Sequence, residues 1–513
     1  MLCAILIIMK IFSWFQRIIA RIEDPLIPLG YFILLFISSM TLRNFLEVFS
    51  DTPELPFRLF SENSPLFFAA NYSLAISFAH YYVFWIFTFL LLSLLFSWIT
   101  KTNILLAIKA LFAGSLIIII TPLFDLMLTR GRGIEIAYAH PENLFYLFPL
   151  PEIVTPGMLA TSICGVILSF SYCAAKTKKW VSGLLAAAVL YILLILLSAL
   201  PAIIKAYHPL PIIRTLGIGI FLEIIVILFL AKPAYMRAVL SGLRCLRMGY
   251  YLAMFFLGIS ISRAGFIQSL TDNFSCLILT VIAFVLSWIG AIMLNDVEDY
   301  EIDIISNKDR LLVKNIFTKN QLQNLSLWLF AAACIFAAAV NFTTLFFTAL
   351  LIANSCIYSL PPLRLRRIPV FSKSLIAFNS LLLVILGWLF AGKDIPQFPR
   401  ALIWYFLVFV TLAANLIDLK DYQGDKQARL KTLAVILGMK KAQFINGLFI
   451  LIAYSALGLV FLDKYILIGG IGLGLLQFFM ITRGIFREKP LLLINFCGIA
   501  ALLFYLNSPL WLK

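Results

Sequence analysis

Two groups of carboxylates in the second half of the chain have the spacing of a cation site. The first group follows directly on a long apolar run and contains five acidic side chains and an Asn, of which Asn295, Asp296, Asp299 and Asp303 have helical spacing. The second group also follows an apolar run and consists of Asp418, Asp421 and Asp425. On a helix that turns by about 100° per residue, the first group spans an arc of about 100° and the second an arc of about 60°. Each group therefore directs its oxygens to one side of a helix. Together the two groups predict a site that binds divalent cations.

Basic side chains follow both acidic groups. Lys308 and Arg310 come after the first group, and Lys426, Arg429 and Lys431 come after the second. Carboxylates that hold Mg²⁺ beside bases that hold phosphate are what a diphosphate substrate requires. A zinc site would need His or Cys ligands, which neither group contains. A solvated helix end is the alternative explanation of a single acidic run, but it does not explain why the pattern recurs with helical convergence.

The order and spacing of four motifs resemble the UbiA superfamily of intramembrane prenyltransferases. The first acidic group matches the family's N-D-x-x-D-x-x-x-D signature, and the second group resembles its second aspartate motif. Tyr358 to Arg366 reads Y-S-L-P-P-L-R-L-R, similar to the family's Y-S-x-P-P-x-R-x-K turn, and Lys431 to Gly438 resembles the segment after the second motif. The chain departs from the family at Arg310-Leu311, where the usual Arg-Pro has lost its turn-forming proline. The resemblance covers residues 241 to 513.

The resemblance implies an enzyme that moves a polyprenyl group from an allylic diphosphate to a membrane-associated acceptor. It implies two Mg²⁺ ions, one held by the first acidic group through Asn295, Asp296 and Asp299, and one held by the second through Asp418 and Asp421. Asp303 and Asp425 would complete or orient these ligand shells. Metal ions and nearby bases neutralise the charge that develops on a departing diphosphate, most effectively in a cavity that excludes water.

The resemblance also assigns roles to single residues. The implied catalytic residues are Asp296, Asp299, Asp418, Asp421 and Tyr358, with the tyrosine close to the departing oxygens or the cation. The implied diphosphate contacts are Lys308, Arg310, Arg364, Arg366 and Lys431. Arg366 stands where the family often has Lys, which preserves the charge and adds a forked donor suited to phosphate.

The elements that must position these groups are membrane-spanning helices. The 513 residues are 63% hydrophobic and 12% charged, with a mean hydropathy of +1.02, whereas an ordinary soluble domain carries roughly 25% charged residues. Apolar segments long enough to cross a hydrocarbon core recur along the chain, which predicts about fifteen transmembrane helices, about six before residue 240 and about nine after it. We therefore expect an all-α polytopic membrane protein with a membrane module of unknown function at residues 1–240 and a prenyltransferase domain at residues 241–513. The later nine spans agree with the helical barrel of the family.

The net charge of +16 follows the membrane topology rather than a nucleic-acid surface. If the first span begins inside and the spans alternate, most of the 40 Lys and Arg residues face the cytoplasm, as the positive-inside rule requires. Both acidic groups and the Pro-Pro turn then share the cytoplasmic face, so the active site is expected to open near that face of a prokaryotic cytoplasmic membrane. The first 22 residues are expected to form a membrane-surface helix rather than a signal peptide.

The first half of the chain carries scattered ionisable residues and no recognised motif. The residues near the outer ends of the expected spans are His80, His140, His208 and Asp125. Interfacial hydrogen bonding is the common role of such residues, and a metal or proton site is the alternative. Lys109 and Glu223 fall inside spans, where an ionisable group is costly unless it is paired. Lipid delivery, a separate enzymatic activity and a scaffold role all stay open for this module.

Two other functions fit a membrane protein with convergent acids. A transporter or channel with acidic cation sites predicts acids near the middle of the membrane. A CDP-alcohol phosphotransferase is also metal-dependent and membrane-embedded, but its D-G-x-x-A-R signature is missing. For the prenyltransferase, Tyr422 to Asp425 looks closer to members that act on lipid, homogentisate or chlorophyll-type acceptors. The expected partners are a polyprenyl diphosphate, a hydrophobic or aromatic acceptor and membrane lipids, and no nucleic acid.

Overall fold

The protein is helical wherever its structure is described. The computed structural model describes residues 13–51, 67–129, 155–204, 209–263, 265–427, 431–483 and 487–508, and within these ranges the chain forms helices and turns without strands. Fourteen of the described helices are long and apolar enough to cross a membrane, and a bent pair, Cys245–Ile261 with Phe266–Asp272, makes a fifteenth if it is one span. The prediction of an all-α, multi-pass membrane protein with about fifteen spans is confirmed.

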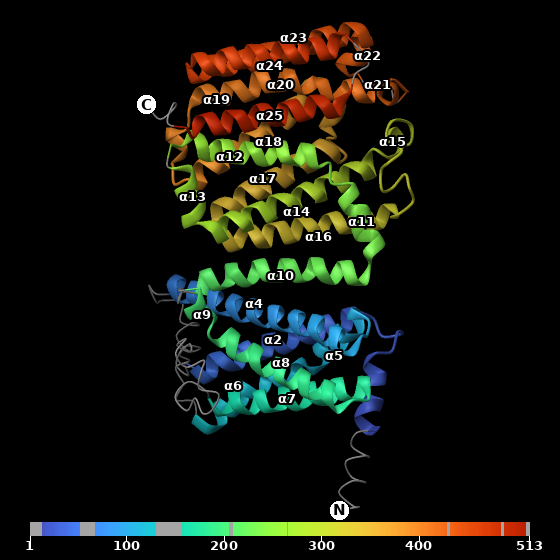
Figure 1. Cartoon of the computed structure of the whole chain (residues 1–513), viewed down its shortest axis with the longest axis vertical. Helices are drawn as coiled ribbons and strands as arrows, with labels where there is room; N and C mark the ends of the chain where they lie inside the picture. Colours follow the sequence, from blue (N-terminus) through green and yellow to red (C-terminus); the bar gives the residue numbers. More distant parts are fainter. Residues whose placement is uncertain are drawn as a thin grey trace, which may run out of the picture. The chain divides into compact units, whose positions relative to one another are not determined.

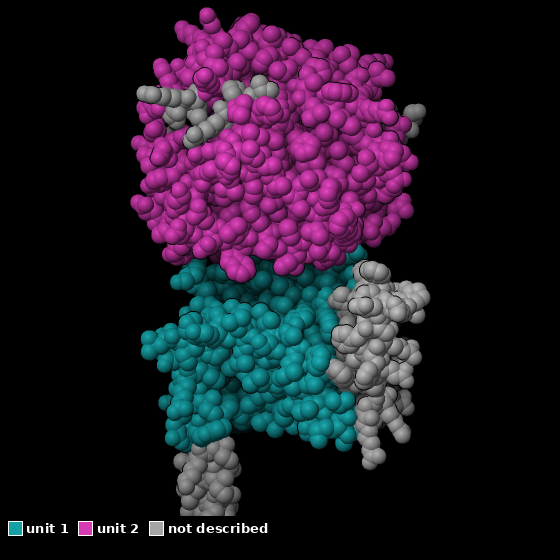
Figure 2. Space-filling view, turned by 180° about the vertical axis from the view of Figure 1, so that it is seen from behind, with its two compact units in different colours: residues 1–233 teal, residues 234–513 magenta. Residues whose placement is uncertain are grey.

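The chain divides into two compact units, residues 1–233 and 234–513 (Figure 2). The expected functional boundary after residue 240 stays a prediction. His140, His208 and most of the expected N-terminal surface helix lie outside the described residues.

The first unit is a bundle of apolar helices around α2 and α4 (Figure 1). Its elements are α2 (Leu29–Asp51), α4 (Phe67–Thr100), α5 (Ile104–Gly114), η1 (Ser115–Ile119), α6 (Ile120–Thr129), α7 (Pro156–Thr177), α8 (Trp180–Ser198), α9 (Leu200–Ile203) and α10 (Pro209–Ala231). The helices α5, η1 and α6 form one candidate span, interrupted by the 3-10 turn of η1. Helix α2 packs against this broken span, α4 packs against α10, and α7 packs against α8.

The two ionisable residues predicted inside spans have different surroundings. Lys109 donates from Nζ to the backbone oxygens of Asp24 at 2.9 Å and Ile27 at 2.7 Å, so it ties the segment before α2 to α5. Glu223 lies on α10 and is 6% exposed. Backbone carbonyls, rather than an ion pair with Glu223, therefore offset the free-energy cost of burying the Lys109 charge inside a span.

The second unit holds the sequence motifs. Its elements are α11 (Pro233–Ser241), α12 (Cys245–Ile261), α13 (Phe266–Asp272), α14 (Phe274–Glu298), α15 (Tyr300–Ser306), α16 (Lys319–Val340), α17 (Phe342–Ser359), η3 (Leu365–Arg367), α18 (Pro369–Phe390), η4 (Ile395–Gln397), α19 (Arg400–Trp404), η5 (Tyr405–Val410), α20 (Thr411–Ala413), η6 (Ala414–Ile417), α21 (Asp418–Gln427), α22 (Leu433–Leu437), α23 (Met439–Phe461), α24 (Lys464–Thr482) and α25 (Glu488–Leu506). From α19 to α21 the chain is one candidate span. With the bent pair, the described part of this unit supplies the nine spans that were expected.

The contacts between these helices close a circuit. The chain of contacts runs from α12 to α14, α17, α18, η5, α23, α24 and α25, and then back to α12. Helices α12 and α18 also pack together, and they cross at Gly258 and Gly387. A methyl group at Gly258 would collide with the Val384 carbonyl, and one at Gly387 would collide with the Phe255 carbonyl. Glycine is required at this crossing because the two backbones touch.

Candidate active site

The first acidic group lies where α14 ends and α15 begins. The sequence predicted one helix through the whole group, but α14 stops at Glu298 and Asp299 adopts φ −100° and ψ 8° at the joint. Helix α15 then starts at Tyr300 and carries Asp303. Asn295 Nδ2 donates to Asp299 Oδ2 at 2.6 Å, which fixes the joint. The helix is therefore interrupted within the first acidic group, which helical spacing alone does not predict.

The acids of this first group are buried although they lie at a helix end. Asp296, Asp299 and Asp303 are each 5% exposed or less. A solvated helix terminus would leave such carboxylates in water, because burying a charge costs free energy unless it is paired. Solvation alone therefore does not explain the first acidic group.

The second acidic group begins α21, at the end of a broken span. The span changes from a π-helical segment at Tyr405–Val410 to a 3-10 turn at Ala414–Ile417 directly before Asp418. Asp418 and Asp425 are buried, and Asp421 is half-buried. Irregular helix of this kind is often found at functional sites, because it redirects side chains that a regular helix would hold on one line.

Asn307 joins the two acidic groups. Helix α15 packs against α21. Directly after α15, Asn307 Nδ2 donates to Asp303 Oδ1 at 2.8 Å and to Asp421 Oδ1 at 3.2 Å. One amide therefore binds a carboxylate from each motif, which brings side chains 114 positions apart in sequence into one site.

Arginines from two segments form ion pairs with the first group. Arg244, between α11 and α12, forms an ion pair with Asp296. Arg310 lies between two acids, with Nε 3.8 Å from Asp296 Oδ1 and 3.6 Å from Asp303 Oδ2. Both arginine side chains are 17% exposed, so these contacts lie largely out of water.

The Pro-Pro turn and the start of α18 supply the remaining bases. Arg366 forms an ion pair with Asp299, and Arg364 Nη2 lies 3.3 Å from Glu298 Oε2. Lys373, at the start of α18, forms an ion pair with Asp418, with both side chains buried. The turn motif and both acidic motifs thus meet in one network.

The remaining predicted residues have less specific positions. Tyr358, at the end of α17, lies within electrostatic range of Asp418 and Asp421. Asp425 is buried and lies within range of Arg366. Lys308 and Lys431 are exposed. The structure therefore gathers the arginines of the predicted diphosphate set around the acids, and leaves these two lysines at the surface.

Burial changes the titration of the groups outside the spans. It raises the pKa of Asp303 to about 6, against the opposing effect of Arg310. Burial also lowers the pKa of Arg244 to about 10, although Asp296 opposes this change. The same cause lowers the pKa of Arg366. In all three groups, removal from water disfavours the charged form more than the neighbouring opposite charges favour it.

The donor chemistry of the site fits a hard divalent cation. The seven carboxylates of the network are Asp296, Glu298, Asp299, Asp303, Asp418, Asp421 and Asp425, and its five bases are Arg244, Arg310, Arg364, Arg366 and Lys373. The acids exceed the bases by two, and the buried Oδ2 of Asp303 has no hydrogen-bond partner within the described chain. Carboxylate oxygens in excess of their counter-charges are the ligands that Mg²⁺ prefers.

The carboxylates are nevertheless not gathered into a ready-made metal cage. Across the described ranges, no group of three His, Cys, Asp or Glu side chains is arranged to hold an ion. The reason is local, because Asp296, Asp299 and Asp418 each turn toward a base. The assignment of metal ligands therefore stays a prediction.

Four residues of the site were not among the predicted site residues, namely Glu298, Asn307, Arg244 and Lys373. Glu298 lies inside the first motif and Asn307 follows it, Arg244 lies between α11 and α12, and Lys373 follows the Pro-Pro turn. Lys373 did carry a signal, since a lysine at the start of an apolar span needs a partner. Arg244 and Asn307 carried none, because their partners depend on how distant helices pack.

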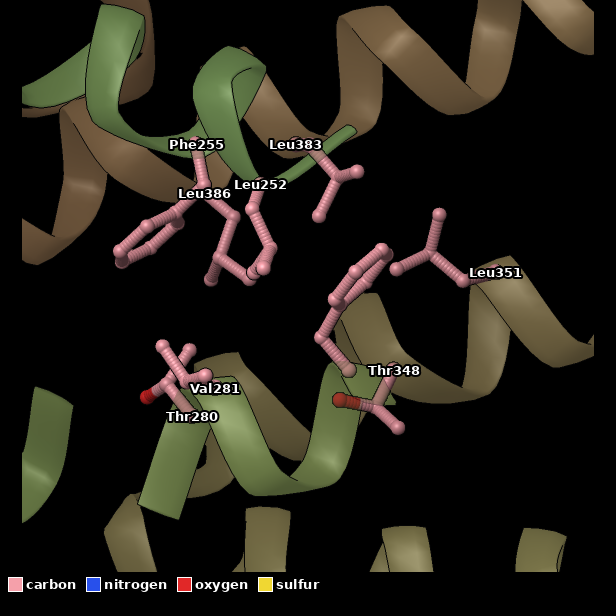
Figure 3. Close-up of a pocket in the computed structure, with 9 residues that line it drawn as sticks. Leu252, Phe255, Thr280, Val281, Thr348, Leu351, Leu383 and Leu386 are labelled. Carbon is pink, nitrogen blue, oxygen red and sulfur yellow. The ribbon is translucent and has the colours of Figure 1, made fainter. Parts of the chain in front are cut away.

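A small apolar pocket lies deeper in the same unit (Figure 3). It is lined by Leu252, Phe255, Thr280, Val281, Phe284, Thr348, Leu351, Leu383 and Leu386, from α12, α14, α17 and α18. Helix α14 runs from this pocket to the first acidic group. Fourteen residues separate Val281 from Asn295, which places the pocket about 20 Å along the helix at 1.5 Å per residue.

Comparisons with known proteins concern this same unit. A family model described as the UbiA prenyltransferase family matches residues 251–497. The chain is 28% identical over 174 residues to digeranylgeranylglyceryl phosphate synthase of Thermococcus gammatolerans, covering 34% of this chain and 61% of that protein. It is 35% identical over 112 residues to the chloroplastic homogentisate solanesyltransferase of Arabidopsis thaliana, covering 20% of this chain and 29% of that protein. The chain thus spans less than two thirds of these relatives.

The structure of a UbiA homolog from Archaeoglobus fulgidus bound to GPP and Mg²⁺ aligns with a TM-score of 0.43 and 19% sequence identity. The alignment covers 54% of this chain and 100% of that chain.

Proposed function

Because residues 251–497 form a UbiA prenyltransferase family domain, we propose that the second half of this chain is an intramembrane prenyltransferase that uses a polyprenyl diphosphate. In the proposed reaction the bond between the allylic carbon and the diphosphate oxygen breaks, and the electron pair leaves with the diphosphate. The allylic carbon then bonds to the acceptor, which loses a proton. The observation that carries the proposal is the contact of Asn307 with both acidic motifs, since it makes one site of two sequence groups.

The acids are proposed to hold Mg²⁺, and the bases are proposed to hold the diphosphate. The candidate ligands are Asn295, Asp296, Asp299, Asp303, Asp418, Asp421 and Asp425. Bound Mg²⁺ would neutralise negative charge on the leaving group. The excess of carboxylates over bases supports this role, as does Asp303 Oδ2, which has an ionic contact with Arg310 but no hydrogen-bond partner within the described chain.

The ion pairs of the site suggest how it prepares for substrate. Arg366 and Lys373 are paired with Asp299 and Asp418. If a cation takes over these carboxylates, the two bases are released beside it and can donate to phosphate oxygens. Arginine suits this exchange because its fork matches carboxylate and phosphate alike. Arg310, between Asp296 and Asp303, would act in the same way.

The apolar pocket is the proposed location of the prenyl tail. Its walls are mostly aliphatic and aromatic side chains, which favour a hydrocarbon. A tail that starts at the acidic groups and ends in this pocket would run about 20 Å along α14. This length favours long prenyl chains over a single isoprene unit.

The acceptor is proposed to be a lipid or an aromatic quinone or chlorophyll-type precursor. The sequence of Tyr422 to Asp425 and the names of the two relatives support both classes. The site is proposed to open toward the cytoplasm of a prokaryotic cell, because the positive-inside rule assigns both acidic groups to that face.

A transporter or channel is not favoured. A cation path through the membrane would place acids near the middle of the spans. Here Asp296 lies in the last turn of the candidate span Phe274–Glu298. Asp418 begins the polar helix α21, directly after the apolar part of the span Arg400–Gln427. Basic side chains lie against both acids.

The decisive assay follows transfer of a labelled prenyl group by the purified full chain. The chain is incubated with labelled geranylgeranyl diphosphate, Mg²⁺ and a panel of lipid and aromatic acceptors. Asp296→Ala and Asp418→Ala should each abolish transfer, while Asp309→Ala should retain it, because Asp309 is on the same loop as Arg310 but its side chain is 98% exposed. Transfer that needs no metal and persists in both aspartate variants would refute the proposal.

A further inference from the structure

The first unit contains a buried polar cluster that the prenyltransferase site does not use. It lies on the last turns of α2 and the facing turns of α4, and we call it the α2 cluster. Its members are Arg43, Asn44, Glu47 and Trp85. Arg43 is 5% exposed, Asn44 is 2% exposed and Glu47 is 4% exposed, although all three lie on a helix of a membrane protein. Polar residues at such positions are rare and mark functional sites.

The members hold one another in place. Arg43 Nη2 lies 3.0 Å from Glu47 Oε1, and Arg43 Nη1 donates to Asn44 Oδ1 at 3.2 Å. The guanidinium lies 4.3 Å from the ring centroid of Tyr81 and 6.0 Å from that of Trp85. The cluster is therefore built and oriented without any further group.

Four buried atoms of the cluster have no hydrogen-bond partner within the described chain. They are Arg43 Nε, Asn44 Nδ2, Trp85 Nε1 and Glu47 Oε2. Native structures leave few buried polar atoms unpaired, and a group of four around one guanidinium calls for an explanation. Three donors and one acceptor thus share one small region, and a ligand is the explanation that satisfies all four.

Other buried polar groups of the first unit do have hydrogen-bond partners. Asp125 accepts from Thr155 Oγ1 at 2.6 Å and from the Gly157 backbone nitrogen at 2.7 Å, at the N-terminus of α7. The Thr121 and Thr161 hydroxyls lie 2.7 Å apart. Apart from the two carboxylate oxygens of Glu223 on α10, the buried side-chain atoms without a hydrogen-bond partner in the described part of the first unit all belong to the α2 cluster.

The charges of the cluster exclude ionic ligands. Arg43 is already paired with Glu47, and Asp125 lies close enough to Glu47 to repel it. An anion would meet two carboxylates, and a cation would meet the guanidinium, both at low dielectric. A hydroxyl group fits, because it accepts from an N–H donor and donates to a carboxylate oxygen. Three donors and one acceptor suit a ligand with several hydroxyl groups.

The position of the cluster indicates where such a ligand comes from. Arg43 and Glu47 lie in the last turns of the span Leu29–Glu47, and Trp85 lies near the start of the span Phe78–Thr100. This is the depth at which lipid headgroups meet the hydrocarbon. On its outer face, α2 exposes Leu42 by 48% and Phe45 by 55%, so lipid can lie one helix thickness away.

We propose that the α2 cluster binds the uncharged, hydroxyl-rich headgroup of a membrane lipid, such as a glycolipid. The ligand hydroxyls accept from Arg43, Asn44 and Trp85 and donate to Glu47. This inference rests on the first unit alone and is independent of the prenyl transfer proposed for the second.

The test measures how lipids shift the thermal unfolding of the full chain. The protein is reconstituted in three separate preparations of phosphatidylcholine nanodiscs. Each preparation contains the same small fraction of one further lipid, which is monoglucosyl diacylglycerol, diacylglycerol or phosphatidic acid. A lipid that binds the native state raises the unfolding temperature in proportion to its affinity. Monoglucosyl diacylglycerol should give the largest rise. A rise no larger than that of phosphatidic acid or diacylglycerol would overturn the proposal.

Variants tie the effect to the cluster. Trp85→Phe and Asn44→Leu should lose the glucolipid-dependent rise, with binding weakened by at least about tenfold. Thr121→Val, which removes a satisfied buried hydroxyl in the same unit, should lower the starting unfolding temperature but keep the rise. Because each variant is compared with itself without glucolipid, loss of packing in Trp85→Phe does not obscure the result. If Trp85→Phe and Thr121→Val keep the same rise, the cluster is not the binding site.

Discussion

Replacing Lys373 by methionine tests whether the site's ion pairs are truly buried. The Lys373 and Asp418 side chains are 5% and 11% exposed. Water and salt therefore screen this ion pair much less than they screen an ion pair at the protein surface. Methionine keeps the length of the side chain but leaves Asp418 as a buried charge without its lysine. Removing one partner of a buried pair costs about 3–5 kcal/mol, which lowers the folding equilibrium constant by a factor of roughly 10² to 4 × 10³.

A double-mutant cycle separates the ion pair from the loss of lysine itself. Asp418→Asn alone strands the lysine charge, whereas Lys373→Met with Asp418→Asn leaves no charge behind. We expect each single variant to be strongly destabilised. The double variant should lose about 2–3 kcal/mol less than the sum of the two single losses, and this difference is the coupling energy. The measurement is denaturant unfolding of the purified chain in detergent without divalent cations. Additive effects within about 0.5 kcal/mol would refute the buried pair.

The same variant has an opposite effect on cation binding. Lys373 and Mg²⁺ compete for Asp418 under the proposed function, so Lys373→Met should show a larger rise in unfolding temperature with added Mg²⁺ than the wild type. Lys314→Met is the matched control, because its partner Asp309 is at the surface. An equal Mg²⁺-dependent rise in Lys373→Met and the wild type would contradict the competition.

Four further outcomes are expected. Asn307→Ala should lower the rate of prenyl transfer by about 10- to 100-fold, since it removes the amide that orients a carboxylate from each motif, and a change below twofold in steady-state assays would contradict this. Gly387→Ala should destabilise the chain by about 1–3 kcal/mol through collision with the Phe255 carbonyl, whereas Gly472→Ala, which meets no atom within 4 Å, should be neutral or stabilising in the same unfolding assay. Chelation with EDTA should abolish transfer and Mg²⁺ should restore it, and transfer that survives EDTA would remove the metal from the proposal. Val281→Phe should fill the apolar pocket and shift the preferred donor to a shorter prenyl diphosphate in a competition assay, and an unchanged preference would place the tail elsewhere.

The sequence was most informative where a pattern is local. Apolar runs of membrane-spanning length predicted the number of helices, because the bilayer fixes both length and composition. The acidic motifs and the Pro-Pro turn are local patterns as well, because each is defined by residue types at short spacing. The sequence also predicted that these motifs share one face of the membrane. Successive spans cross in alternating directions, so every second loop lies on the same face. The structure brings these segments together in the second unit through Asn307, Arg364 and Arg366.

The sequence was less informative about partners. It treated the bases near the motifs as equal candidates, yet Lys308 is exposed while Arg310 lies between two buried acids. It singled out His80 and Asp125 in the first half, but it gave no weight to Arg43 and Glu47. An oppositely charged pair at positions i and i+4 is common on exposed helices. Only the structure shows that neighbouring helices bury this one.

What the sequence by itself determined is the class of the protein, its spans and the motifs that mark the second half. The tertiary structure alone decided which base meets which acid, where α14 breaks, and that Asn307 touches both motifs. The physical reason is that a helix's own period fixes which of its residues share a face, but not the rotation or neighbour of that helix. Those are set by packing, as at Gly258 and Gly387, where two backbones in contact fix how α12 and α18 meet.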